Sequence, residues 1–533
     1  MAEVPRLRVR RSIADIQADY DAGRKTELET LVRAWKGVQD LGPNDFNAFF
    51  MIGGFHGEPF RGPGAQTTAW WGGYCQHGTV LFPSWHRAYL DRLERALRSI
   101  PGCASVTLPF WDETSAASRA HGIPRVLTDE TFVLDGQVIP NPLRSFRLPA
   151  TIRDAVAGDK ELYTKPAAYE TVRYPLSGLV GTAADRAATA AHNARYPTAT
   201  DQNRLLNDNV VNWLTTGFTV GGNKVGLVAA MFADCLDAPT YTLFSNTTSA
   251  KAWNDAHPAE LVVPLEKPHN SMHLAVGGFD VPGQGNFSPI AGANGDMGEN
   301  DTAGLDPIFY FHHCFIDYVF WIWQRRHGAT DALVIDSADP GAKYDPNNPP
   351  PAGADPAATM SLTTPLEPFF VEYGVPFTTA DVINIERQMG YTYGPGSLDA
   401  YATPAAVAAA AAVPATPSGA RPHAVYVAGI DRSKIRGSFL IATWADLDGQ
   451  RQLIGLDPVL SRWHVTGCAN CQTRLRVTSD TALPPGADPR TVAVQVHTRD
   501  GVLGAPPATT SLGAAPLMRE MAAAGAPFSV EIR

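Results

Sequence analysis

The chain has 533 residues, of which 44 % are hydrophobic and 18 % are charged, and its formal net charge at pH 7 is −10. This composition is typical of an ordinary globular protein with more than one domain. A net negative charge argues against nucleic acid or an anionic membrane surface as a partner. The chain has no run of about 18 apolar residues, which argues against a membrane span.

The N-terminal residues are basic and lack the apolar core that export signals carry. Six cysteines are too few for a disulfide framework in a chain of this length. Together these two features predict a cytoplasmic protein.

The first helix that bears a candidate site residue is expected to open at His86, nine residues after His77. His86 shares one helical face with three leucines and should therefore point into the core. The i,i+4 pair Glu94/Arg98 lies on the opposite face, where we expect it to be solvated.

A second helix is predicted from Pro268 to the glycine pair at 277–278. His269 and His273 are four residues apart and stack on one face, as in helices that chelate metal ions. Asn270 stands where the zinc-protease motif His-Glu-x-x-His has its glutamate, which argues against that class of enzyme.

A third helix is predicted to begin at Asp306, which can cap the free amides, and Pro307, which suits the first helical position. The residues that follow are apolar almost all the way round, so this helix should be buried on every face. His312 and His313 lie in its middle. Each nitrogen of a buried imidazole needs a partner, and a metal ion is one such partner.

Any single one of the fourteen histidines is most simply a core or surface residue. Three helices that each turn a histidine inward argue for a metal site instead. An all-imidazole donor set suits copper or zinc. No carboxylate lies at i,i+3 from these histidines, which disfavours a carboxylate-bridged di-iron site.

Residues 402–419 are rich in alanine and proline and carry no bulky side chain, which is typical of a linker. Beyond them the hydrophobic period changes to that of strands, as at Val492, Val494 and Val496. We therefore predict three parts: a mainly α catalytic domain over residues 1–395, a linker over 396–420 and an all-β sandwich domain over 421–533.

Two of the histidine segments resemble the copper-binding signatures of the tyrosinase family, the type-3 copper proteins that include polyphenol oxidases. One runs from His77 through Phe-Pro-Ser-Trp-His86-Arg to Glu94, and the other runs from Asp306-Pro through His313 to Asp317. Both match at every specified position. With the sequences Leu-Pro-Phe-Trp-Asp at 108–112 and Tyr-Thr-Tyr at 391–393, the resemblance covers about residues 5–395.

The resemblance implies a four-helix bundle that holds two copper ions, with O2 as co-substrate. The first copper would be held by His56, His77 and His86, and the second by His269, His273 and His313. His312 would be a neighbour in the wall, and Asp317 a hydrogen-bonding partner one turn beyond His313.

In fungal tyrosinases the thiol of a Cys-x-His sequence is joined to the imidazole, which implies a thioether between Cys75 and His77. The alternative is an unmodified Cys75 that packs as a small apolar residue. In tyrosinases the phenol's proton is taken by a water that a glutamate and an asparagine hold. By their offsets these would be Glu260 and Asn270, with Glu266 as a rival for Glu260.

The resemblance therefore favours a tyrosinase, which hydroxylates small monophenols, oxidises diphenols to o-quinones and so contributes to melanin biosynthesis. A catechol oxidase or an o-aminophenol oxidase would share every metal ligand. An oxygen-binding dicopper protein and a zinc hydrolase are more distant alternatives. The sequence leaves open whether the chain forms a homo-oligomer.

Residues 421–533 resemble, more loosely, the β-rich domain that covers the active-site mouth in plant and fungal polyphenol oxidases. This implies a latent enzyme in which one side chain lies over the coppers, with Tyr426, Trp444 and Trp463 as candidates. Such an enzyme would gain activity on cleavage in the linker.

The C-x-x-C formed by Cys468 and Cys471 resembles a motif of fungal covers that has been tied to copper delivery. Thiolates suit Cu(I), so this role is physically sensible. A small zinc site that includes His464, or a disulfide, would fit the same residues.

Overall fold

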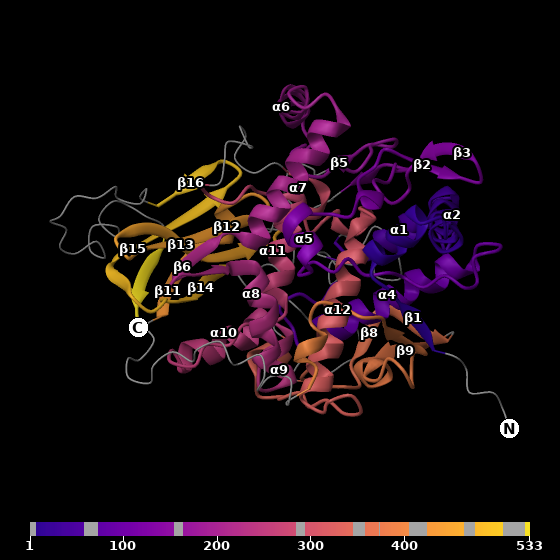
Figure 1. The fold of residues 1–533 in the computed structure, drawn as a ribbon. Helices are drawn as coiled ribbons and strands as arrows, with labels where there is room; N and C mark the ends of the chain where they lie inside the picture. Colours follow the sequence, from indigo (N-terminus) through magenta and orange to yellow (C-terminus); the bar gives the residue numbers. More distant parts are fainter. Residues whose placement is uncertain are drawn as a thin grey trace.

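A helical domain and a β-domain lie side by side in the computed structural model (Figure 1). The structure describes residues 7–57, 73–153, 164–283, 294–344, 358–372, 374–403, 424–462, 475–504 and 528–533. The predicted order, a mainly α part followed by an all-β part, is confirmed. Among the described residues, no helix combines the length and the apolarity that crossing a membrane requires.

The helical domain is built from helices of very different length, joined by long loops. In chain order they are α1 (Ile13–Asp21), α2 (Thr26–Asp40), α3 (Phe49–Gly53), α4 (Phe82–Ser99), α5 (Ala116–His121), α6 (Ala183–Asn193), α7 (Ala199–Thr215), α8 (Leu227–Asp234), α9 (Tyr241–Ser245), α10 (Thr247–Ala256), α11 (Glu266–Gly277) and α12 (Ile308–Arg326). The three predicted histidine helices are α4, α11 and α12.

Helix α12 lies at the centre of the domain and packs against α4. Its residues are buried from Ile308 to Gln324, as its all-round apolarity predicts. The carboxylate of Asp306 accepts a 3.1 Å hydrogen bond from the amide of Ile308, so Asp306 caps the helix as expected. The helix itself begins one residue later than predicted, because Pro307 precedes its first turn.

Helix α4 begins at Phe82, four residues before His86, so His86 lies one turn inside it. The expectation that the Glu94/Arg98 pair is solvated is wrong for Glu94, whereas Arg98 is partly exposed. Glu94 is 0 % exposed and accepts a 2.9 Å hydrogen bond from Nε of Arg10, which is also 0 % exposed. The N-terminal strand covers this face of α4, and periodicity within the helix gives no sign of such a distant partner.

Asp317 does not bond to His313, which corrects the predicted contact. Its Oδ1 accepts a 2.5 Å hydrogen bond from Nε of Arg87, and its Oδ2 accepts bonds of 2.6 and 2.5 Å from the hydroxyls of Tyr391 and Tyr393. Arg10 lies 3.3 Å from the same Oδ2. We call Arg10, Arg87, Glu94 and Asp317 the charge clamp. Although burial alone would raise it, Arg87 and Arg10 hold the pKa of Asp317 below its usual range.

Short strand pairs complete the helical domain. They are β1 (Arg8–Arg10) with β10 (Tyr391–Tyr393), β2 (Thr131–Leu134) with β3 (Gln137–Pro140), β4 (Ile152–Arg153) with β5 (Thr164–Lys165), β6 (Gly217–Val220) with β7 (Asn223–Gly226), and β8 (Pro365–Glu372) with β9 (Val375–Thr378). Of the pairs named here, β1 with β10 brings together the first and the last described segments of the helical domain, and these two strands run parallel.

The packed chain of this domain runs past the predicted boundary at 395. The amide of Ser397 donates to Asp112 Oδ2 at 2.8 Å, and the hydroxyl of Tyr318 donates to Asp399 Oδ1 at 3.0 Å. Leu398 and Ala402 are buried in the same core. Residues 396–403 therefore belong with the helical domain, and residues 404–420 of the predicted linker lie outside the described residues.

The β-domain contains two antiparallel sheets. Its strands are β11 (Ala424–Asp431), β12 (Phe439–Leu447), β13 (Gln450–Val459), β14 (Arg476–Ala482), β15 (Ala487–Thr498), β16 (Gly501–Leu503) and β17 (Ser529–Ile532). The sheet orders are β14-β11-β17 and β13-β12-β15-β16. Side chains from both sheets, such as Val425, Ile441 and Val494, form one core, which confirms the predicted sandwich.

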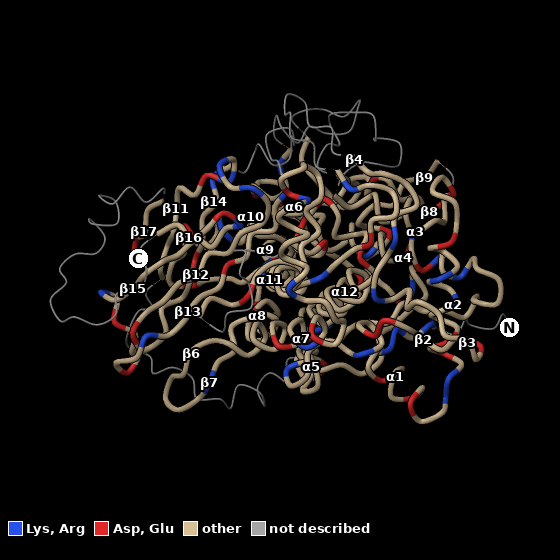
Figure 2. The backbone as a smooth tube through the Cα atoms, turned by 90° about the horizontal axis from the view of Figure 1, so that it is seen from above, with Lys and Arg blue, Asp and Glu red and all other residues tan. Residues whose placement is uncertain are grey.

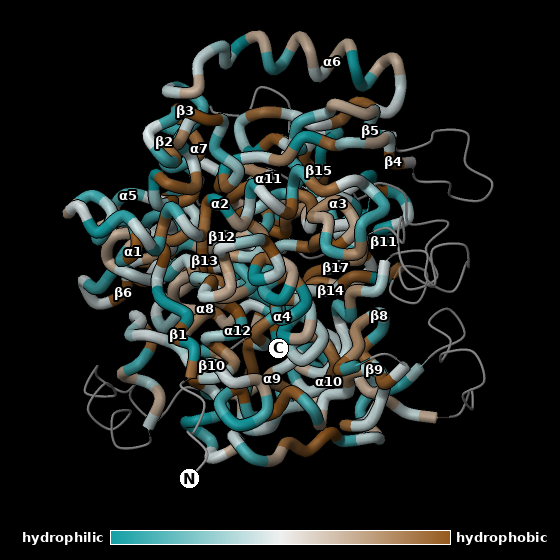
Figure 3. Tube along the Cα trace, turned by 90° about the vertical axis from the view of Figure 1, so that its right-hand side faces the viewer, coloured by the Kyte–Doolittle hydropathy of each residue, from teal (hydrophilic) through white to brown (hydrophobic). Residues whose placement is uncertain are grey.

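The larger sheet is buried on both faces. Phe439 and Ile441 of β12 point into the sandwich core, whereas Leu440 and Ala442 between them join the core of the helical domain, as does Leu456 of β13. Hydrophobic stretches accordingly concentrate toward the middle of the molecule, whereas acidic and basic residues are interspersed along the tube (Figures 2 and 3). The β-domain is therefore fixed to the helical domain by apolar packing.

Candidate metal centre

The first cluster of site residues joins three separate segments. His56 follows α3, His77 lies in the loop before α4, and His86 lies on α4, yet one ring nitrogen from each falls within 4.8 Å of the others. Nδ1 of His86 donates to the carbonyl of Phe82 at 2.8 Å, and Nδ1 of His56 lies 3.3 Å from the carbonyl of Asn300. These bonds place the ring proton on Nδ1 and leave Nε2 as the ligand atom.

The second cluster consists of His269 and His273 on α11 and His313 on α12. Their Nε2 atoms are 3.0, 3.2 and 3.4 Å apart. Metal–nitrogen bonds of about 2.0 Å put the nitrogens of a trigonal site about 3.5 Å apart, so the three rings fit one ion. Nδ1 of His273 is held at 2.7 Å by the carbonyl of Met297, and Nδ1 of His269 at 2.9 Å by Oδ1 of Asn270.

Burial prepares these imidazoles for metal. Among the described residues, Nε2 of His56 and of His86 is buried without a hydrogen-bond partner. Burial, and then the neighbouring imidazoles, hold the pKa values of His56, His86, His269, His273 and His313 well below the usual range. Neutral imidazole is the form that binds metal ions. The residues therefore fit metal in both clusters.

The two clusters are adjacent. The rings of His86 and His313, one from each cluster, stack with centroids 4.4 Å apart, and those of His77 and His269 are 5.4 Å apart. The two candidate metal sites therefore adjoin each other, and each cluster would hold its own ion.

His312 lies directly beside the three histidines of the second cluster. A ring nitrogen of His312 falls within 4.8 Å of the three ligand atoms. Its Nδ1 shares a 2.6 Å hydrogen bond with Oε1 of Glu113, and both side chains are 0 % exposed. Burial lowers the pKa of His312 to about 3 and raises that of Glu113 well above the usual range, so both are neutral. Sequence reasoning missed Glu113, although it directly follows the Leu-Pro-Phe-Trp-Asp run.

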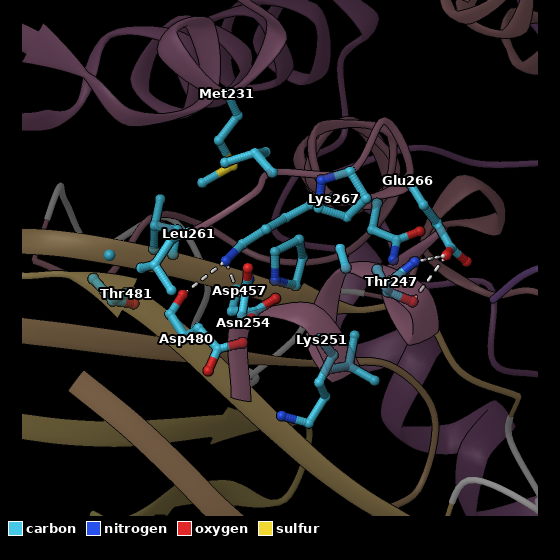
Figure 4. A pocket seen from close by; sticks show the side chains of 18 of the residues that line it. Met231, Thr247, Lys251, Asn254, Leu261, Glu266, Lys267, Asp457, Asp480 and Thr481 are labelled. Atoms are coloured by element: carbon cyan, nitrogen blue, oxygen red, sulfur yellow. Dashed lines mark hydrogen bonds and ion pairs between the residues drawn. The ribbon is translucent and has the colours of Figure 1, made fainter. Parts of the chain in front are cut away.

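A cavity of about 1130 Å³ leads from the metal centre into the contact between the two domains. Cys75, His77 and Asn270 line its metal end, whereas Leu456 and Asp457 of β13 line its far wall. Segment 140–250, in which the sequence shows no motif, supplies a third wall from β6, α8 and α10. Figure 4 shows part of this cavity.

Of the two glutamates weighed for the proton-accepting role, the structure brings Glu266 to the cavity and leaves Glu260 outside. Glu260 is exposed at the end of a turn, in which its amide donates to the carbonyl of His257. Glu266 is 3 % exposed, lines the cavity and stands one helical turn before Asn270. Its oxygens accept hydrogen bonds from the amides of Gly78 and Thr247. Among these two, Glu266 therefore lies at the cavity, and Glu260 does not.

Cys75, the cysteine of the predicted thioether, lies beside His77. Its Sγ is 3.3 Å from Nδ1 of His77. Burial raises the pKa of the Cys75 thiol to about 12, so an unmodified thiol there is protonated. Cys468, Cys471, His464 and Trp463 lie outside the described residues, and neither Tyr426 nor Trp444 is among the residues that line the cavity.

The β-domain also contacts the loop that contains Asn300 and Asp301. The amide of Asn300 donates to the carbonyl of Ser461 at 3.3 Å, and Nε of Arg462 donates to Oδ1 of Asp301 at 2.7 Å. The carbonyl of the same Asn300 lies against Nδ1 of His56. The loop of Asn300 and Asp301 therefore contacts both the β-domain and the first histidine cluster.

Comparison with known proteins agrees with this geometry. The family model described as the common central domain of tyrosinase matches residues 47–326. The chain is 50 % identical over 499 residues to the tyrosinase HcTyr2 of Hahella sp. (strain CCB-MM4), covering 90 % of this chain and 88 % of that protein. It is 42 % identical over 499 residues to a tyrosinase of Aspergillus oryzae (strain ATCC 42149 / RIB 40), covering 88 % and 87 %.

Among solved structures, the tyrosinase from Burkholderia thailandensis at low pH superposes with a TM-score of 0.81 at 45 % identity, over 99 % of this chain and 100 % of that one. The similarity thus extends through both domains. The predicted family is confirmed: this chain belongs to the tyrosinase family of copper-dependent phenol oxidases.

Proposed function

We propose that this chain is a tyrosinase that holds one copper ion on His56, His77 and His86 and a second on His269, His273 and His313. The observation that carries the assignment is the pair of buried three-histidine clusters whose ligand nitrogens converge. Imidazole-only donor sets with an open position suit copper that must bind a further ligand.

Bound at both clusters, copper supplies O2 binding and the two-electron oxidation of the phenol. The chain's own residues orient the ligands, because carbonyls and Asn270 hold the Nδ1 atoms of His56, His86, His269 and His273. The apolar residues of α12 exclude water from behind the second cluster.

Hydroxylation of a monophenol also requires that its proton be removed. We assign this step to a water held between the carboxylate of Glu266 and the amide NH2 of Asn270. Oδ1 of Asn270 is taken by His269, which leaves the NH2 group to donate to such a water. Glu266 lies in the cavity wall one helical turn before Asn270, where its carboxylate can accept a hydrogen bond from the same water.

This pair of residues favours a tyrosinase with monophenolase and diphenolase activity over a catechol oxidase or an o-aminophenol oxidase. A zinc hydrolase is disfavoured, because Asn270 stands at the position where the zinc-protease motif has its glutamate. The substrate is a small phenol.

The buried thiols of Cys103, Cys235 and Cys314, outside any disulfide, support a reducing, cytoplasmic location.

We further assign a thioether between Sγ of Cys75 and the ring carbon of His77 beside Nδ1. The 3.3 Å contact between Sγ and Nδ1 supports it. Such a bond would fix the ring of His77, which lies in the loop before α4. Its formation removes the thiol hydrogen and one ring hydrogen, and O2, the co-substrate of the proposed function, would be the oxidant that takes up the two electrons and two protons. A peptide containing both residues would therefore be lighter by two hydrogen atoms in the mature, copper-loaded protein.

The β-domain acts in this proposal as a cover that makes the enzyme latent. It forms the far wall of the cavity and contacts the loop of Asn300, whose carbonyl lies against Nδ1 of His56, which supports this role. Trp463 remains the candidate for the side chain over the coppers. Cys468 and Cys471 remain candidates for copper handling.

One experiment tests the function as a whole. Copper content per chain is measured on the full chain, and oxygen uptake with a monophenol and with a catechol is measured both with the cover closed and in mild denaturant that releases it. The proposal predicts about two copper ions per chain and oxygen uptake with both substrates. Uptake with the catechol alone would make the chain a catechol oxidase, and copper binding without turnover would make it an oxygen-binding protein.

A further inference from the structure

Lys267 occupies an unusual place next to the metal centre. It is the second residue of α11 and stands two residues before His269. A cation near a helix N-terminus is electrostatically unfavourable, because the helix dipole is positive there. Lys267 also lines the same cavity as His77 and Asn270. The stability of α11 therefore gives no reason for a lysine at this position.

The partners of Lys267 come from the β-domain. Its Nζ donates to the carbonyl oxygen of Asp480 on β14 at 3.1 Å and lies 3.6 Å from Oδ2 of Asp457 on β13 (Figure 4). The side chains of Lys267 and Asp457 are 16 % and 18 % exposed, so water screens this ion pair only in part. Within the described residues, its ion-pair partner therefore lies across the domain contact.

The nearest acid on the helical domain has other partners. Glu266 precedes Lys267 directly, but its carboxylate accepts hydrogen bonds from Gly78 and from both the amide and the hydroxyl of Thr247. In Figure 4 the Glu266 and Lys267 side chains point to different sides of the helix. If the β-domain moves away, Asp457 and Asp480 leave with it, and Lys267 loses the partners that offset the helix dipole.

A second lysine that lines the cavity, Lys251, has an ion-pair partner on its own domain. Nζ of Lys251 lies 3.4 Å from Asp255 on its own helix and 4.7 Å from the ring centroid of Tyr426. Its i,i+4 partner remains when the domains part. Of these two lysines, Lys267 is the one that combines a position beside the metal ligands with an ion-pair partner on the β-domain.

We propose that Lys267 binds the carboxylate of acidic phenols and that Asp457 takes the place of that carboxylate when the cover is closed. This rests on the proposed function and names its substrate class: phenols with a short side chain that ends in a carboxylate. An ammonium group binds an oxyanion as a compact charge with three donors, and the helix N-terminus adds to the attraction. Acidic substrates then compete with the cover for one cation.

The test uses the full-length, copper-loaded chain and two isosteric phenols, 3-(4-hydroxyphenyl)propanoate and its amide. Lys267→Met is expected to lower the ratio of kcat/KM for the acid to that for the amide by about fivefold, mainly through KM. Lys251→Met is the matched control and should leave the ratio unchanged. Raising the ionic strength should lower the ratio in the wild-type chain and leave it constant in Lys267→Met.

Two further variants complete the experiment. Lys267→Arg should restore the ratio, because the charge returns, and Asp457→Asn should raise it, because the cover no longer competes. If Lys267→Met keeps its copper but lowers kcat/KM equally for the acid and the amide, Lys267 only links the two domains, and the proposal is overturned. Failure of the wild-type chain to oxidise even the amide, both with the cover closed and after mild denaturant has released it, would count instead against the proposed function.

Discussion

At the scale of single residues, the adjacent histidines of α12 show how orientation separates a ligand from its neighbour. Nε2 of His313 completes a triangle with Nε2 of His269 and of His273, whereas Nδ1 of His312 is engaged by Glu113. The Nε2 atoms of His269, His273 and His313 lie 3.0–3.4 Å apart, a spacing that fits one ion, whereas a ring nitrogen of His312 is placed only within 4.8 Å of them.

We expect His313→Ala to lose one of about two copper ions per chain, and His312→Ala to retain both, because three imidazoles suffice for the second ion. Metal analysis after dialysis against a weak chelator measures this directly. The opposite result, loss of copper only in His312→Ala, would exchange the roles of the two histidines.

Glu266 and Glu260 form a second pair in which position decides the role. Glu266 lines the cavity and Glu260 is exposed outside it. Glu266→Gln should lower the monophenolase rate by about 100-fold, the lower end of what a positioned proton acceptor contributes, and should lower the diphenolase rate far less. Glu260→Gln should change neither rate. Initial rates on a matched monophenol and diphenol give the ratio, and a selective loss in Glu260→Gln would reverse the assignment.

At the scale of elements, the charge clamp holds the helices that carry His86 and His313. Arg87 of α4 bonds to Asp317 of α12, and Arg10 of β1 bonds to both Asp317 and Glu94. All four side chains are buried, so removing one partner leaves charge without compensation in the core.

We expect Asp317→Ala to lower the free energy of unfolding by about 3–5 kcal/mol, since it leaves two buried arginines without their shared partner. Asp317→Asn should lose less, because the amide oxygen still accepts a hydrogen bond from Arg87. Denaturant unfolding of the copper-free proteins measures both. Equal stability of Asp317→Ala and the unaltered chain would show that the clamp contributes nothing to the fold.

At the scale of the whole molecule, the β-domain is packed on the helical domain as well as tethered to it. One face of β12 and β13 belongs to the helical core, and ion pairs such as Arg462–Asp301 and Arg499–Asp185 surround that contact. An apolar contact of this kind holds without a covalent linker.

A protease site introduced between residues 404 and 420 should therefore leave the two halves associated after cleavage. We expect them to elute together in gel filtration, and oxidation of a bulky diphenol to rise several-fold only when mild denaturant separates them. An uncut chain in the same denaturant is the control. Dissociation upon cleavage alone would show that the linker, and not the packing, retains the cover.

The sequence by itself determined the parts of the site that local pattern encodes. His269 and His273 follow from their spacing on one helix, His86 from its place among leucines, and the burial of α12 from its lack of a polar face. The alternation of Val492, Val494 and Val496 predicts strand β15 for the same reason. Each of these features depends on the geometry of one element, which a few neighbouring residues determine.

Tertiary structure decided what depends on residues distant in the chain. Strands β12 and β13 lack clean alternation because both faces of their sheet are buried, and Glu94 is buried because Arg10 crosses it from the N-terminus. Glu266 and not Glu260 reaches the cavity because a turn directs Glu260 outward. The partner of Lys267 lies on another domain. A sequence pattern records which face of an element is apolar, whereas the group that covers that face is selected by packing across the whole molecule.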